Sequence, residues 1–120
     1  MVSTHTIRGT MPRESLGLVQ GTVDVLILKT LTWGPLHGYG ISQLIRQRTD
    51  GELAVEDAAL YQALHRLERK GWVSSEWGTS EFNRRARFYE ITREGRRRLH
   101  ADVAELRRYV DALFKILQPA

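Results

Sequence analysis

Residues 57–91, DAALYQALHRLERKGWVSSEWGTSEFNRRARFYEI, decide the fold because their periodicity changes partway along. The first part has apolar residues at helical spacing and ends in Lys70-Gly71, a cation and a glycine that are typical of a helix C-terminus. The second part contains two short runs of aromatic and β-branched residues with a period of two. This stretch therefore predicts one helix followed by a two-stranded hairpin.

The predicted helix begins at Asp57, which we expect to be its N-cap, and it has two different sides. The apolar stripe that we expect to face the core consists of Leu60, Ala63, Leu64 and Leu67. The opposite side is small, polar and basic and holds no acidic residue; it consists of Ala58, Gln62, His65, Arg66 and Arg69. Such a side suits contact with a polyanion.

The hairpin is predicted to have strands at residues 72–77 and 86–91 and a tip at residues 78–85. Its return side carries Arg84 and Arg85, with Arg87 two residues further on. We expect these arginines to lie beside the basic side of the preceding helix, although the two groups are separated in the sequence.

Two more helices are predicted upstream, at residues 22–33 and 38–49, with Gly34-Pro35 ending the first of them. Three helices followed by a hairpin is the order of a winged helix-turn-helix, a mainly α fold with a small β-hairpin (α+β). We expect this domain to span residues 18–92 and a flexible arm to precede it at residues 1–17.

The last segment, residues 93–118, is predicted to be a dimerisation helix that Thr92 caps and that runs from Arg93 to about Leu117. Its apolar residues follow a heptad spacing: Leu99, Val103, Leu106, Val110, Leu113 and Leu117. A helix of this length spans roughly 37 Å, more than a compact three-helix body needs. We therefore predict a homodimer, the alternative being that the helix packs on the first helix of its own chain.

The net charge of +4 lies in one part of the chain, since residues 57–98 hold ten Lys/Arg against six Asp/Glu. Localised positive charge favours a nucleic-acid partner, because contacts with phosphates release condensed counterions. The longest aliphatic run, Val25–Leu28, is far shorter than the ~20 residues that cross a bilayer, so we expect a cytoplasmic protein without a membrane partner.

Enzyme chemistry finds little support in the sequence. The 120 residues contain no cysteine, which excludes disulfides, thiolate metal sites and a cysteine nucleophile. There is no Walker glycine loop, no HExxH and no GxGxxG, and the four histidines lack metal-ligand spacing. We therefore predict a non-enzyme without a cofactor or metal, and we expect His37 to set the start of the second helix with Tyr39 packed behind it.

Four blocks of the sequence resemble the PadR-type transcriptional regulators: LVQGTVDVLILK (18–29), GPLHGYGI (34–41), LYQALHRLE (60–68) and NRRARFYEIT (83–92). They occur in the family's order over about residues 16–100. The resemblance implies a dimeric winged-helix repressor of the short form, with a single C-terminal helix. Its partners would be a pseudo-palindromic operator in double-stranded DNA, a second copy of itself and, often, a small molecule that releases it.

The third helix departs from the family pattern, because Ala58-Ala59 replaces the usual Gly-Ser/Thr and Gln62 replaces a proline. Gln62 suits an adenine edge and the alanine methyls suit thymine methyls, so the operator is expected to differ. For Tyr61 two readings stay open, a phosphate contact and boundary packing under the wing. The full set of predicted DNA contacts is Ala58, Ala59, Tyr61, Gln62, His65, Arg66, Arg69, Arg84, Arg85 and Arg87.

The sequence also suggests residues for a ligand pocket. Trp33, Tyr109 and Phe114 are candidates to line an aromatic pocket at the dimer interface, and core packing is the alternative. Two other functions compete with operator binding. One is a winged-helix protein-interaction module without its own operator. The other is an RNA binder, which is disfavoured because the deep, narrow major groove of A-form RNA excludes such a helix.

Overall fold

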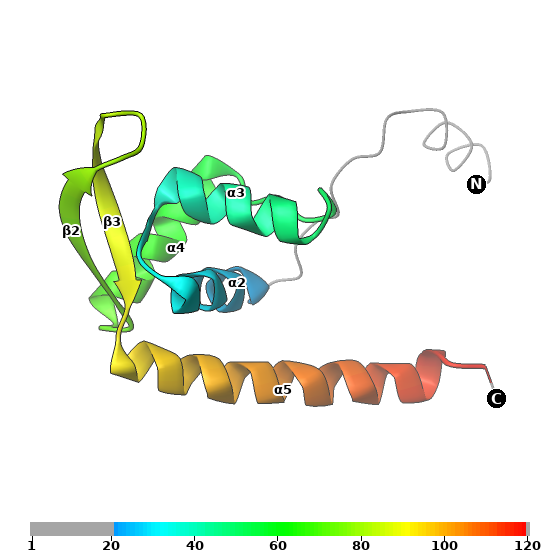
Figure 1. The fold of residues 1–120 in the computed structure, drawn as a ribbon. Coiled ribbons are helices and arrows are strands. Elements are labelled where there is room, and N and C mark those ends of the chain that lie inside the picture. Colours follow the sequence, from blue (N-terminus) through cyan, green and yellow to red (C-terminus); the bar gives the residue numbers. More distant parts are fainter. Residues whose placement is uncertain (1–20, 120) are drawn as a thin grey trace, which may run out of the picture.

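The computed structural model describes residues 21–119, so the predicted N-terminal arm lies outside the described residues. Three helices precede a hairpin and one long helix follows it, which confirms the predicted winged fold (Figure 1). The elements are α2 (Thr22–Thr30), η1 (Leu31–Trp33), β1 (Leu36–His37), α3 (Gly38–Arg48), α4 (Asp57–Arg69), β2 (Val73–Thr79), β3 (Arg85–Ile91) and α5 (Arg93–Leu117).

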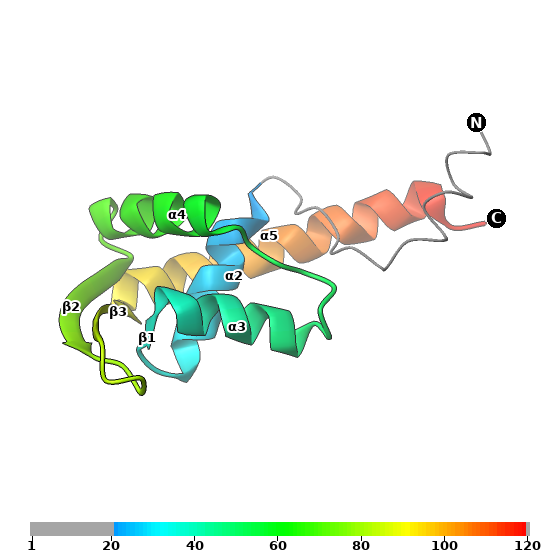
Figure 2. The ribbon, with the colours of Figure 1, turned by 90° about the horizontal axis from the view of Figure 1, so that it is seen from above.

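The core lies between α2, α3 and α4, where each helix contributes its apolar stripe. Ile27 and Leu28 of α2, Ile41 of α3 and Leu60 and Leu64 of α4 are all fully buried. The predicted inward stripe of α4 is confirmed, since its buried residues are Leu60, Ala63, Leu64 and Leu67. In the view from above, α3 and α4 lie over α2 with the hairpin at one end of both (Figure 2). The outer side of α4 is therefore left exposed next to the hairpin.

The hairpin belongs to a three-stranded antiparallel sheet with the order β1-β3-β2. The sequence prediction missed β1, because two residues are too few to show an alternating pattern. β1 pairs with β3 through Leu36 with Tyr89 and His37 with Phe88, which ties the hairpin to the start of α3. β2 and β3 are longer than predicted, so the tip is reduced to residues 80–84. We call β2, β3 and this tip the wing.

The helix caps match the predictions in two cases and differ in one. The Thr92 side chain caps α5 by accepting from the Gly95 N–H at 3.0 Å, as predicted. His37 caps α3, its Nδ1 accepting from the Gly40 N–H at 3.0 Å. The prediction for α4 was wrong: Glu56 is the N-cap residue, and Asp57 is already helical. Placed in the first turn, the Asp57 carboxylate still lies where the helix dipole favours a negative charge.

The two halves of α5 have different surroundings. Its first half packs on α2, with Leu99 in the core at 8% exposed and Val103 packed against the core. Leu99 is thus a core residue of its own chain, which corrects its assignment to the dimer seam. The second half extends beyond the other helices (Figures 1 and 2) and is exposed throughout residues 107–117. No helix among residues 21–119 combines the length and apolarity that a bilayer span needs.

Candidate nucleic-acid interface

The outer side of α4 is a solvent-exposed strip, as the sequence predicted. Of its predicted residues, Ala58, Gln62, His65 and Arg69 are exposed, and so are Ala59 and Tyr61 at its two edges. The small side chains come at the start of the helix and the basic ones towards its end. This side is free for contact with a groove of duplex DNA, into which an α-helix fits.

Arg66 is the exception on this side. Its Nη2 donates to Asp24 Oδ1 of α2 at 2.6 Å, so the guanidinium is turned towards its own chain. The ion pair joins α4 to α2 across the base of the domain. The predicted DNA contact of Arg66 therefore competes with a structural role, whereas Arg69 stays exposed at the end of α4.

The side of the wing that faces α4 carries a tryptophan between two guanidinium groups. Trp77 pairs with Arg87 and Thr79 with Arg85 across the hairpin, so these side chains share one face. The Arg85 guanidinium lies 4.5 Å and that of Arg87 5.4 Å from the centre of the Trp77 ring. Such cation–π contacts hold both arginines in place without neutralising their charge.

Arg87 also connects the wing to α4. Its Nε donates to Ser75 Oγ at 2.9 Å and its Nη2 to Glu68 Oε2 at 3.4 Å. Ser75 in turn donates to Glu68 at 2.7 Å. This small network ties β2 and β3 of the wing to Glu68 of α4.

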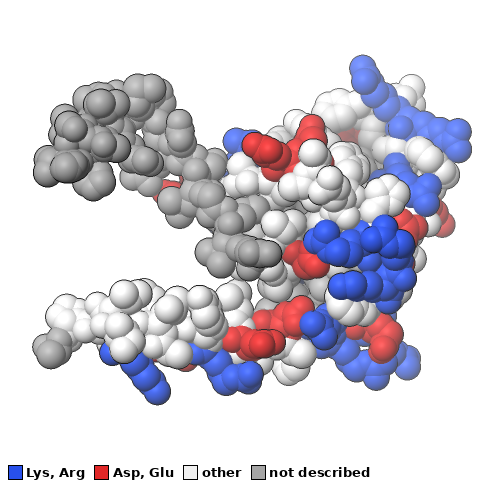
Figure 3. Space-filling model, turned by 180° about the vertical axis from the view of Figure 1, so that it is seen from behind, with Lys and Arg blue, Asp and Glu red and all other residues white. Residues whose placement is uncertain are grey.

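A groove of about 890 Å³ runs between the wing and the beginnings of α3 and α4. Tyr61 contributes to one wall, and Arg84, Arg85 and Arg87 contribute to the other. The arginines of the hairpin thus share a groove with Tyr61, which lies at the edge of the outer side of α4. Lys and Arg gather along the side of the molecule that carries the wing (Figure 3).

Tyr61 shows the boundary packing that was one of its two readings, and its phosphate contact stays a prediction. Its hydroxyl lies so close to Gly38 that a Cβ at that position would collide with it. Gly38 therefore allows α4 to approach the start of α3, and Tyr61 packs at this boundary. The ring is still 46% exposed in the groove, where its hydroxyl can reach a ligand.

Four residues of this region were not predicted as part of the site: His37, Trp77, Glu81 and Phe82. His37 Nε2 lies 3.4 Å from Glu81 Oε1, and the Tyr39 and Phe82 rings meet edge to face at 6.3 Å. Tyr39 is therefore packed against the wing tip rather than only behind His37. The aromatic residues Trp77 and Phe82 were a local signal in the sequence, but nothing local indicated the contact between His37 and Glu81, which are 44 residues apart.

Two pKa values are shifted in this region. A backbone hydrogen bond, followed by the side-chain hydrogen bond with His37, lowers the pKa of the Glu81 carboxyl, so the carboxylate form is favoured. Burial raises the pKa of the Tyr89 phenol, so the neutral form of this groove residue is favoured.

The three residues predicted for an aromatic pocket are not brought together within one chain. Trp33 lies at the end of η1 and contacts Lys29 and Arg48, whose charged groups are 5.3 Å and 4.6 Å from its ring centre. Tyr109 and Phe114 are exposed on the second half of α5, which extends away from η1 in both views (Figures 1 and 2). A pocket that includes these two residues would need a second chain.

Comparison with known proteins agrees with this geometry. The model of the Transcriptional regulator PadR-like family matches residues 27–101. A transcriptional regulator from Clostridium thermocellum is 33% identical with a TM-score of 0.76, over 82% of this chain and 96% of the other. A PadR family transcription regulator from Clostridium difficile is 27% identical with a TM-score of 0.68, over 82% of this chain and 100% of the other.

One further structure, PadR from Bacillus subtilis, was solved in complex with operator DNA. It is 21% identical to this chain with a TM-score of 0.61, over 68% of this chain and 46% of the other. At this identity the likeness concerns the fold.

Proposed function

This chain belongs to the PadR-like family of transcriptional regulators, which are not enzymes, and from that premise we propose that it represses transcription by binding a pseudo-palindromic DNA site as a homodimer. The observation that carries the proposal is the groove between Tyr61 of α4 and three arginines of the wing, together with the exposure of the outer side of α4. In the proposed complex, α4 enters the major groove and the wing contacts the flanking backbone.

The roles of the α4 residues follow from their chemistry and exposure. Gln62 is exposed near the middle of the outer side and can form a bidentate pair with adenine, while Ala58 and Ala59 can contact thymine methyls. Tyr61, His65 and Arg69 are exposed and would contact phosphates on either side of the groove. Arg84 and Arg85 would bind phosphates or enter the adjacent minor groove.

The second half of α5 supports the homodimer. Among its residues, Val110, Leu113, Phe114, Ile116 and Leu117 are large, apolar and exposed. A contiguous apolar surface of this kind is typical of an interface, and a second copy of the same helix offers the matching surface. A dimer built on this half would place two copies of α4 on successive turns of the duplex, roughly 34 Å apart.

The decisive experiment is selection of bound sequences from a random duplex pool with the full chain. We expect enrichment of a palindrome whose half-sites are about one turn apart. Binding to the selected duplex should weaken steeply between 50 and 200 mM salt, by roughly a thousandfold if six phosphates are contacted. A pool without enrichment, together with affinity that does not depend on salt, would instead support a protein-interaction module on the winged fold.

A further inference from the structure

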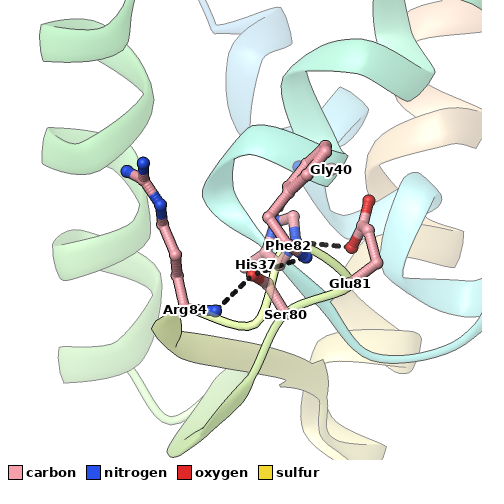
Figure 4. Close-up of polar contacts among 6 residues, drawn as sticks. All are labelled: His37, Gly40, Ser80, Glu81, Phe82 and Arg84. Atoms are coloured by element: carbon pink, nitrogen blue, oxygen red, sulfur yellow. Dashed lines mark hydrogen bonds and ion pairs between the residues drawn. The ribbon is translucent and has the colours of Figure 1, made fainter.

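The wing tip is attached to the start of α3 by two contacts, which we call the tip clasp. His37 Nε2 lies 3.4 Å from Glu81 Oε1, and the Phe82 ring meets the Tyr39 ring edge to face at 6.3 Å. Figure 4 shows Glu81 and Phe82 on the side of the tip that faces α3, with Arg84 extending from the other side towards α4. The tip therefore lies between the two helices, with a clasp on one side and a cation on the other.

His37 is a rigid anchor for this clasp. Its Nδ1 accepts the Gly40 N–H, so a neutral ring carries its proton on Nε2, which then donates to the Glu81 carboxylate. The ring is buried and packs against Phe88 with 5.2 Å between the ring centres. Because β1 also pairs with β3, His37 is held by backbone and side-chain contacts together.

The tip transmits the position of Glu81 to Arg84 because it is a tight turn. The Ser80 N–H donates to the Arg84 carbonyl at 2.8 Å, and Ser80 Oγ accepts from the Arg84 N–H at 3.3 Å. Asn83 has a φ of +59°, a left-handed conformation that asparagine tolerates better than most residues. These bonds between Ser80 and Arg84 enclose a loop of three residues, 81–83. Such a loop has few conformations, so we expect Glu81 and Arg84 to move together.

We propose that His37 and Glu81 are positioning residues for DNA binding, because the tip clasp holds Arg84 and Arg85 on the side of the wing that faces α4. The inference rests on the proposed function, which supplies the DNA that these arginines would contact. It also explains why a carboxylate lies next to the arginines of the wing tip. Charge alone would make Glu81 unfavourable near phosphates, whereas the clasp makes it favourable.

The two effects of Glu81 have opposite signs, and this makes the proposal testable. If Glu81 acted only through its charge, E81A would strengthen binding to the selected duplex. If the clasp positions the arginines, E81A weakens binding by roughly two- to fivefold in spite of the lost negative charge. The matched control is E76A, which removes an exposed carboxylate from β2 of the same wing and should leave affinity unchanged or slightly higher. Tighter binding by E81A would overturn the proposal.

The variant H37N tests the other partner of the clasp. Asparagine is a good N-cap residue, so α3 keeps its cap while the side chain becomes too short to reach Glu81. We expect H37N to weaken binding by about as much as E81A, and the double variant to be no weaker than either single one. Additive losses would mean that the two residues act separately, and the clasp would then be rejected.

Hydrogen exchange of the DNA-free protein gives a readout that does not depend on the proposed function. The amides of residues 80–84 should exchange faster in H37N and E81A than in the wild-type protein, and E76A should leave them unchanged. Unchanged exchange in both clasp variants would overturn the inference while leaving DNA binding itself intact. If the wild-type protein did not bind duplex DNA, that result would instead refute the proposed function.

Discussion

The α4–wing face and the second half of α5 are both exposed, but they differ in chemistry. The first carries arginines that are ordered by neighbours: Arg87 by Ser75 and Glu68, and Arg85 by Trp77. The second carries large apolar side chains, of which Ile116 is 84% exposed. The charged arginines of the first face favour binding to a polyanion, and the uncovered apolar side chains of the second favour contact with another apolar surface.

The difference also shows how one helix can serve two purposes. The first half of α5 completes the core of its own chain through Leu99, whereas the second half leaves the same heptad stripe uncovered. A continuous sequence pattern is thus divided by tertiary packing into an intramolecular and an intermolecular part. Substitutions in the two halves of α5 and in the α4–wing face should therefore have different effects.

The largest effect is expected for the double substitution L113E/L117E. Both leucines are exposed in a single chain, so the fold should survive, whereas charges at a dimer seam would weaken association by about a thousandfold or more. Sedimentation should report monomers. The control A104E/K115E changes the opposite side of the same helix and should remain dimeric. A persistent L113E/L117E dimer would place the interface elsewhere.

A substitution in the first half of α5 should affect folding instead. L99A removes a core side chain and should lower the free energy of unfolding by about 2–4 kcal/mol. Measured by urea unfolding in the L113E/L117E background, the value does not include dimer dissociation. In the same background, I116A should change stability by less than about 0.5 kcal/mol. If L99A and I116A lowered the free energy of unfolding equally, the division of α5 into two halves would be contradicted.

On the wing, R84E/R85E should weaken binding to the selected duplex by about a hundredfold, because two phosphate contacts become repulsive. Fluorescence anisotropy at fixed salt measures the change. The double variant R107E/R108E has the same change in net charge on exposed positions of α5, and a much smaller loss is expected. Equal losses would show that overall charge, and not the wing, determines affinity.

Arg66 and Arg69 provide a smaller test within α4. R66A breaks the ion pair with Asp24 and should cost up to about 1 kcal/mol of stability with little change in DNA affinity. R69A should lower DNA affinity with little change in stability, since the Arg69 side chain is exposed at the end of the helix. A larger loss of affinity in R66A than in R69A would restore the sequence-based assignment of Arg66 to the DNA.

The smallest effect is expected in alkaline solution. Burial raises the pKa of Tyr89, so its contribution to stability is complete below the ordinary value of 10.0 and is lost as pH rises through the higher folded-state pKa. Unfolding midpoints of the wild-type protein should fall above pH 10. Y89F removes the ionisable group, so its unfolding midpoint should fall less steeply with pH. If the midpoints of both proteins fell equally with pH, other groups would dominate the alkaline loss of stability.

The sequence by itself determined the order of elements, the inward stripe of α4, the Thr92 cap and the resemblance to the family. These depend on periodicity and on residues within one or two turns of each other, which a single chain displays directly. It did not reveal β1, the Glu56 cap, the role of Leu99 in its own core or the ion pair of Arg66 with Asp24. Only the tertiary structure decided these, and above all the contact between His37 and Glu81. Whether two distant side chains meet depends on how the helices and the sheet pack, and local spacing does not encode that.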